Sequence, residues 1–149
     1  MESNKRVYLK KYERYYLDTS IWMDLYEDRK GYNQEPLGDF AWKLLGLIKA
    51  KKNNLLIISD LLIRELEMNY SLEEINGMMK LFENIIEKII TTKMQRNEAK
   101  RIATERNLPT GDALHAILAR DYKLILVTRD KHFRQLEDIS SHHKPEELI

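Results

Sequence analysis

The sequence has 149 residues, of which 43% are hydrophobic and 33% charged, a composition typical of a globular protein able to bury a core. Its 25 basic and 24 acidic residues give a formal charge of +1, which excludes the strongly basic field of proteins that coat nucleic acid. The absence of cysteine excludes disulfides, thiolate zinc sites and cysteine nucleophiles.

The first residues and the length of the apolar runs indicate where in the cell the protein is located. The first residues are charged and lack the apolar segment of a signal peptide, and no apolar run approaches the roughly 18 residues of a membrane span. We therefore expect a cytoplasmic protein without a membrane partner. We also expect a basic N-terminal arm over residues 1–14 and a single domain over residues 15–149.

The first half of the domain alternates short apolar runs with helical patterns. Residues 15–17 predict a strand, and a helix opens after it at Ile21. A second helix is predicted over residues 38–51, and residues 55–58 predict a second strand, after which Ser59 caps a further helix. The apolar face expected on the second helix consists of Phe40, Leu44, Leu47 and Ile48, with Trp42 and Leu45 beside it.

In the second half, Ser71 begins a capping box, and apolar residues at helical spacing over residues 72–89 predict one helix. A charged helix is predicted over residues 93–106, and Pro109 and Thr110 introduce an apolar one. The elements expected beyond these are a strand over residues 124–127, a short helix after Phe133 and a solvated tail containing His142 and His143.

Strands separated by helices predict a parallel sheet, because parallel strands need crossover connections. Three strands are clear, and one or two more are expected near Thr91 or Ile139. The predicted fold class is therefore α/β, a three-layer α/β/α sandwich with a central parallel sheet of four to five strands wrapped by helices.

Four acidic residues fall where such a sheet would gather them. Asp18 and Asp130 follow the first and third strands, Glu65 lies in the helix behind the second strand, and Asp112 opens the helix that leads to the third. Ligand sites of open parallel sheets lie outside the carboxyl ends of the strands, so we expect these carboxylates at one edge.

Each carboxylate also has a purely structural interpretation. Asp18 and Asp130 can cap the helices that follow them, Asp112 suits the dipole of a helix start, and Glu65 can be an exposed helix residue. Their common position favours a site. Clustered carboxylates repel each other unless they bind a cation or hold protons, and oxygen ligands without cysteine favour Mg²⁺ or Mn²⁺.

One or two such ions support phosphodiester hydrolysis. Neighbouring polar residues have expected supporting roles. Thr19, Ser20 and Thr128 can hydrogen-bond the carboxylates. The candidate phosphate contacts flank the acids and are Arg64, Arg129 and Lys131. We expect His115 to be a packed histidine with one nitrogen satisfied, although it lies one turn from Asp112 and could touch the site. We expect Asp24 to be a surface acid, with an outer-shell position at the site as the alternative.

The chain resembles the PIN domain family, which includes the ribonuclease toxins of toxin–antitoxin pairs. The resemblance spans about Tyr16 to Glu147 and is carried by four segments in order, which are residues 17–20, 59–66, 111–116 and 127–133. It implies a central parallel sheet, an acidic pocket that binds Mg²⁺ or Mn²⁺, and cleavage of single-stranded RNA.

The resemblance also implies roles for individual residues. The four acids named above fall on the acidic positions of the family, with Asp18 and Asp112 as the firmest metal ligands, and Glu65 is preferred to Glu67 because Leu66 follows it. An antitoxin protein and a homodimer are the implied protein partners. The segment over residues 71–106 is longer than in the smallest toxins, so a housekeeping role stays open.

Two other functions are weighed against a nuclease. A catalytically silent PIN-type module could bind RNA or dimerise with the same fold, although retention of all four acids argues against it. A phosphatase using Asp18 as nucleophile would want a second acid where Ser20 stands. Enzymes that bind dinucleotides are disfavoured because no glycine-rich turn follows a strand.

Overall fold

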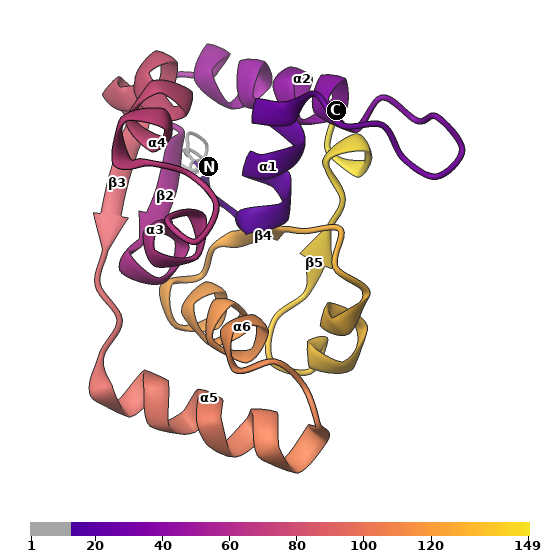
Figure 1. Ribbon diagram of the computed structural model, residues 1–149. Helices are drawn as coiled ribbons and strands as arrows, with labels where there is room; N and C mark the ends of the chain where they lie inside the picture. Colours follow the sequence, from indigo (N-terminus) through magenta and orange to yellow (C-terminus); the bar gives the residue numbers. More distant parts are fainter. Residues whose placement is uncertain (1–12) are drawn as a thin grey trace, which may run out of the picture.

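The computed structural model describes residues 13–149 and contains a five-stranded parallel sheet in the order β3-β2-β1-β4-β5 (Figure 1). The strands are β1 (Arg14–Leu17), β2 (Leu55–Ser59), β3 (Ile86–Ile89), β4 (Ile125–Val127) and β5 (His142–His143). Most of the predicted basic arm, residues 1–12, lies outside the described part, and Arg14 already belongs to β1.

Helices cover both faces of the sheet, as predicted, and make three layers (Figure 1). The α-helices are α1 (Thr19–Glu27), α2 (Leu37–Ala50), α3 (Asp60–Leu66), α4 (Leu72–Met79), α5 (Lys93–Arg106) and α6 (Thr110–Tyr122). The 3-10 helices are η1 (Lys80–Ile85), η2 (Lys131–Leu136) and η3 (Pro145–Glu147).

Successive side chains of each strand point to opposite faces of the sheet, so the core has two parts. Tyr16 and Leu126 point to the side covered by α5, α6 and η2, whereas their neighbours Leu17 and Val127 pack with residues of α1 and α2. Both faces of the central strands are therefore buried, which explains why those strands are short apolar runs in the sequence.

The segment predicted as one helix over residues 72–89 is three elements. The capping box of Ser71 and Glu74 starts α4 as expected, but the chain passes through η1 and then forms β3, which pairs with β2 at the edge of the described sheet. Ile86 and Ile89 are half-buried while Glu87 and Lys88 are exposed. Residues 80–85 therefore form a 3-10 helix in place of the predicted α-helix, and residues 86–89 form one of the additional strands expected near Thr91 or Ile139.

Two smaller expectations also differ from the structure. On α2 the buried face contains Ala41, while Trp42 and Leu47 are about half exposed. His142 and His143 were expected in a solvated tail but form β5, which pairs with β4 and supplies the fifth strand.

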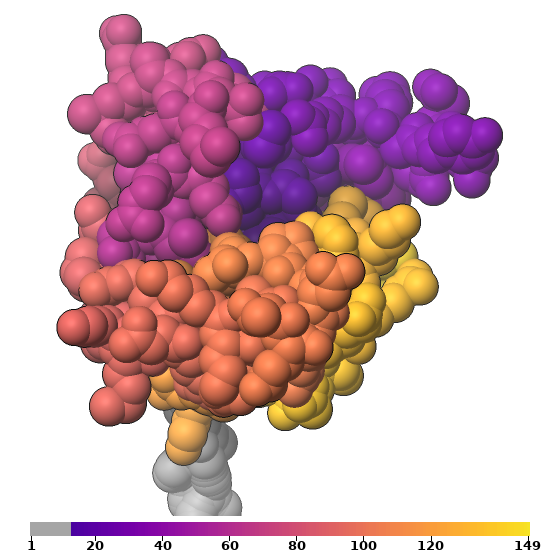
Figure 2. All heavy atoms as spheres, turned by 60° about the horizontal axis from the view of Figure 1, so that its bottom comes forward, coloured from indigo at the N-terminus to yellow at the C-terminus, as the bar shows by residue number. Residues whose placement is uncertain are grey.

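Residues 28–36, between α1 and α2, project from the body of the molecule (Figure 2). A bridge between Lys30 and Pro36 closes this arm, and Tyr32 on it is 99% exposed. Among residues 13–149, no helix combines the length and apolar character needed to cross a membrane.

The order of the strands fixes where a ligand can bind. β1 has β2 on one side and β4 on the other, so the chain crosses over in opposite directions from the centre of the sheet. The crevice beyond the carboxyl ends of β1 and β4 is the point where open α/β sheets bind ligands.

Candidate metal centre

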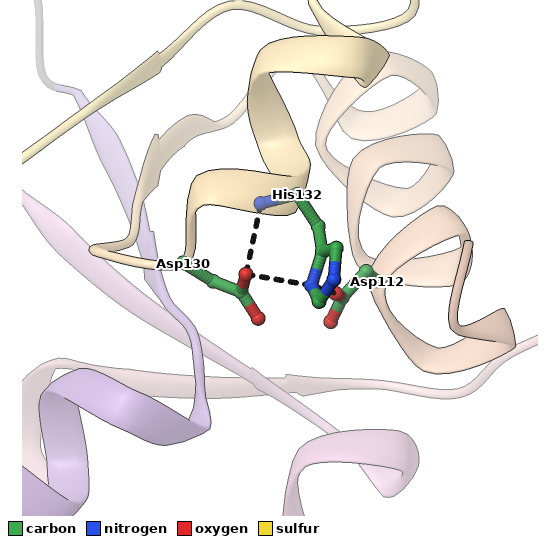
Figure 3. A group of neighbouring side chains, drawn as sticks. All are labelled: Asp112, Asp130 and His132. Carbon is green, nitrogen blue, oxygen red and sulfur yellow. Dashed lines mark hydrogen bonds and ion pairs between the residues drawn. The ribbon is translucent and has the colours of Figure 1, made fainter. Parts of the chain in front are cut away.

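Three side chains converge beside the carboxyl end of β4 (Figure 3). Asp112 lies in the first turn of α6, Asp130 caps η2, and His132 belongs to η2. The Nδ1 atom of His132 lies 2.8 Å from Oδ1 of Asp130 and 3.1 Å from Oδ2 of Asp112. One donor atom from each residue lies within 4.8 Å of the others, a spacing suited to a shared cation.

The electrostatics of this cluster favour a cation. Burial, reinforced by the charge of Asp130, raises the pKa of Asp112 to about 7. Oδ2 of Asp112 and Nδ1 of His132 are buried, and neither has a well-aligned hydrogen-bond partner in the described chain. Two carboxylates and an imidazole with lone pairs left over are a donor set that a divalent ion would satisfy.

Asp18 joins this cluster through Thr128. The Asp18 carboxylate is only 5% exposed and accepts hydrogen bonds from Ser20 Oγ at 2.7 Å and from Thr128 Oγ1 at 2.5 Å. Thr128 Oγ1 in turn accepts the backbone N–H of Asp130 at 3.0 Å. Burial raises the pKa of Asp18, and its charge also acts on Asp112.

Glu65 lies on α3, close to Gly111 at the start of α6. Its Oε1 accepts hydrogen bonds from Thr19 Oγ1 at 2.5 Å and from His115 Nε2 at 2.8 Å. Burial would raise the pKa of Glu65, but the hydrogen bond and charge of His115, with the Thr19 bond, outweigh it and lower that pKa. Oε2 lies against Gly111, the residue before Asp112.

A buried chain of hydrogen bonds stands behind Glu65. The hydroxyl of Tyr16 lies 2.7 Å from both His115 Nδ1 and Ser59 Oγ. Because an ionised carboxylate only accepts, Nε2 of His115 is the donor to Glu65. Both ring nitrogens of His115 are thus bonded, where only one was expected, and the residue contacts a candidate site acid.

The three predicted phosphate contacts have different surroundings. Arg129 is largely buried and pairs with Glu146 at 2.6 Å and with Asp24 at 3.3 Å. Asp24 itself is 4% exposed, so its interpretation as a surface acid was wrong. Arg64 is 65% exposed and lies 3.7 Å from Asp60, while Lys131 is exposed on η2.

The structure thus places the four predicted carboxylates at one end of the sheet. Asp112 and Asp130 lie together, Thr128 links Asp18 to Asp130, and Glu65 lies beside Gly111, the residue before Asp112. Glu65 is half-buried in this pocket, whereas Glu67 is exposed. His132 was not expected in the site. Its only sequence signal was its place two residues after Asp130, and its approach to Asp112 depends on how η2 packs.

A family model described as PIN domain matches residues 15–139. No curated protein matches the chain.

Three solved structures share the fold at low identity. VapBC2 from Rickettsia felis, bound to a DNA fragment from its promoter, has a TM-score of 0.58 and 21% identity over 88% of this chain and 96% of that one. A toxin–antitoxin complex from Klebsiella pneumoniae has a TM-score of 0.59 and 18% identity over 88% of this chain and 97% of that one. PAE2754 from Pyrobaculum aerophilum has a TM-score of 0.54 and 18% identity, with coverages of 99% and 95%.

Proposed function

Because the chain belongs to the PIN domain family, we propose that it is a metal-dependent endoribonuclease that hydrolyses phosphodiester bonds of single-stranded RNA. PIN domains are generally nucleases, and the acidic cluster at the switch point of the sheet supports that activity here. The observation that carries the proposal is the convergence of Asp112, Asp130 and His132 on one point.

We assign the metal site to Asp18, Glu65, Asp112 and Asp130, with His132 as an additional ligand. These donors suit Mn²⁺ or Mg²⁺, and the imidazole favours Mn²⁺ of the two because Mg²⁺ prefers oxygen ligands. The bound ion would activate a water molecule as nucleophile and offset the charge of the phosphodiester.

The surrounding residues hold the carboxylates in place. Ser20 and Thr128 occupy both oxygens of Asp18 and fix its rotamer, while Thr19 and His115 orient Glu65. This support limits the motion of the carboxylates that we assign as ligands.

We propose an antitoxin protein as a partner. The similar structures from R. felis and K. pneumoniae are of toxin–antitoxin systems, and the family resemblance adds a homodimer as the expected assembly. The antitoxin would protect the host cell from the RNA cleavage proposed here.

RNA cleavage in Mn²⁺ by purified protein tests the nuclease assignment. Asp18→Asn and Asp112→Asn should each lower the cleavage rate by at least about 100-fold, because either change removes a charge that holds the ion. Asp39→Asn, on the exposed face of α2, is the control and should cleave like wild type. Equal rates for all four proteins would refute the proposal and favour a silent binding module.

A further inference from the structure

We propose that Lys131, Arg134 and Lys144 form an anion subsite that binds an RNA phosphate beside the one being cleaved. The inference rests on the proposed function and extends it from the metal site to the substrate. These residues line a cavity of about 270 Å³ that also reaches Asp130. The cavity is far larger than a single water site, so it has room for an oxyanion with its own water molecules.

The 3-10 geometry of η2 separates its side chains into rows. With three residues per turn, residues at i and i+3 lie above one another. Phe133 and Leu136 are fully buried and anchor the helix in the core. Lys131 and Arg134 form a second row and are exposed, while His132 faces Asp112. The same turn therefore presents cations on one side and a metal-site imidazole on another.

The three cations are free to bind an anion. None of them forms an ion pair with a carboxylate within residues 13–149, in contrast to Arg129, which is held by Glu146 and Asp24. Glu147 also lines the cavity, but it accepts the backbone N–H of Lys144 at 3.1 Å. The cations thus exceed the free carboxylates around the cavity.

Two of these cations also border a second hollow next to the metal site. Lys131 and Arg134 line a second hollow of about 480 Å³, on whose wall His132 lies. One hollow therefore reaches the metal cluster at Asp130 and the other at His132, with the same two cations between them. A single-stranded RNA chain has a phosphate at every nucleotide, so neighbouring phosphates of one strand suit this arrangement.

Binding of a single-stranded RNA oligonucleotide in the presence of a chelator tests the subsite without requiring cleavage. The triple variant Lys131→Gln, Arg134→Gln, Lys144→Gln should bind at least about tenfold more weakly at low salt. Its plot of log K against log[salt] should be shallower by about 0.7, since the subsite holds one phosphate and each single-strand phosphate contact contributes roughly that amount. All three side chains are exposed, so the thermal midpoint should stay near that of wild type.

A control with the same loss of charge is available at the other end of the strands. Lys51, Lys52 and Lys123 are exposed and precede β2 and β4, at the amino ends of the strands. Their triple change to Gln should leave RNA affinity nearly unchanged. Equal weakening by both triple variants would mean that only net charge matters and would overturn the proposal.

Two forms of the oligonucleotide identify which phosphate binds. If the subsite holds an internal phosphate, RNA with a 5′-phosphate and RNA with a 5′-hydroxyl should lose affinity equally in the variant. A loss confined to the 5′-phosphorylated RNA would overturn the proposal, because the cations would then bind a chain terminus and not a phosphate beside the scissile one. Because no metal is present, loss of the nuclease assignment would leave this result standing, and unchanged binding would refute the subsite alone.

Discussion

The carboxylate of Glu65 is held from three directions. Thr19 and His115 both donate to Oε1, and the main chain at Gly111 lies against Oε2. Tyr16 supports His115 from behind through a buried hydroxyl. A carboxylate fixed in this way has little freedom to relax, so a small change beside it should affect the pocket more than the fold.

Gly111→Ala tests this point. An added Cβ would lie 2.5 Å from Oε2 of Glu65, so the carboxylate must move away from its place beside Asp112. Gly111 has no positive φ, and alanine has a helix propensity better by up to about 1 kcal/mol. We expect the urea-derived free energy of unfolding to be unchanged or higher, and the rate of RNA cleavage in Mn²⁺ to fall by roughly tenfold or more.

Gly46→Ala is the matched control. A Cβ there meets no atom within 4 Å, so this variant should gain up to about 1 kcal/mol in stability and cleave at the wild-type rate. Wild-type cleavage by Gly111→Ala would show that the position of Glu65 does not matter to the reaction.

The sequence could predict the acids but not all of their partners. Asp18 and Asp130 follow strands, and the carboxyl ends of parallel strands meet at one edge whatever the packing details. The burial of Asp24 depends on Arg129 reaching it from the far side of the chain, and the second bond of His115 depends on Tyr16. Such contacts come from tertiary packing, which a local pattern does not contain.

At the scale of elements, a single carboxylate ties the edge of the sheet to α3. Asp60 accepts hydrogen bonds from the backbone N–H and the hydroxyl of Thr91, both at 2.9 Å, just after β3 ends. In the described sheet β3 lies at the edge beside β2, so this tie adds a restraint at its carboxyl end. Burial raises the pKa of Asp60, but the bonds from Thr91 outweigh it and lower that pKa.

The stability of this tie should therefore depend on pH. A carboxylate with a lowered pKa in the folded state stabilises the protein above its unfolded pKa of about 3.9, and that contribution is lost as the pH falls through the folded value. Asp60→Asn should lower the free energy of unfolding by about 1 kcal/mol at pH 7, because amide replaces an ionised acceptor. The difference in the free energy of unfolding between wild type and Asp60→Asn should shrink as the pH falls below about 4.

Urea unfolding of both proteins at pH 7 and pH 3 measures this difference. Asp39→Asn, whose side chain is 54% exposed, is the control and should change the free energy of unfolding by only a few tenths of a kcal/mol at either pH. A deficit for Asp60→Asn that is as large at pH 3 as at pH 7 would show that ionisation of Asp60 plays no part.

The predicted helix extended wrongly over β3, although an additional strand was expected near Thr91. Apolar residues from Leu72 to Ile89 recur at helical spacing, and the capping box at Ser71 begins a real helix. An edge strand needs few buried side chains, so Ile86 and Ile89 satisfy both a helical and a strand pattern. The central strands were predicted correctly because burial on both faces makes them continuous apolar runs.

At the scale of the whole molecule, the topology gathers negative charge at one point. Crossing over in both directions from β1 brings Asp18, Asp112 and Asp130 together from distant parts of the sequence. Burial of Asp112, together with the mutual repulsion of these acids, raises the pKa of Asp112, so its ionised form destabilises the folded state near neutral pH. A divalent cation that binds the folded chain would remove this penalty.

Manganese should therefore raise the thermal midpoint of the protein. A ligand at 100 times its Kd stabilises the folded state by about 2.7 kcal/mol. For a chain of this length that corresponds to a shift of about 5–10 °C, given roughly 2–4 °C per kcal/mol. Scanning calorimetry with excess Mn²⁺, compared with excess chelator, measures the shift.

Two variants show whether the shift arises at the proposed site. Asp112→Asn should raise the midpoint measured in chelator, since it relieves repulsion in the pocket, and should abolish most of the response to Mn²⁺. Asp39→Asn should keep the full response, because Asp39 lies on the exposed face of α2. A response of the same size in Asp112→Asn would place the ion elsewhere, since a ligand can stabilise the fold only through groups that bind it in the folded state.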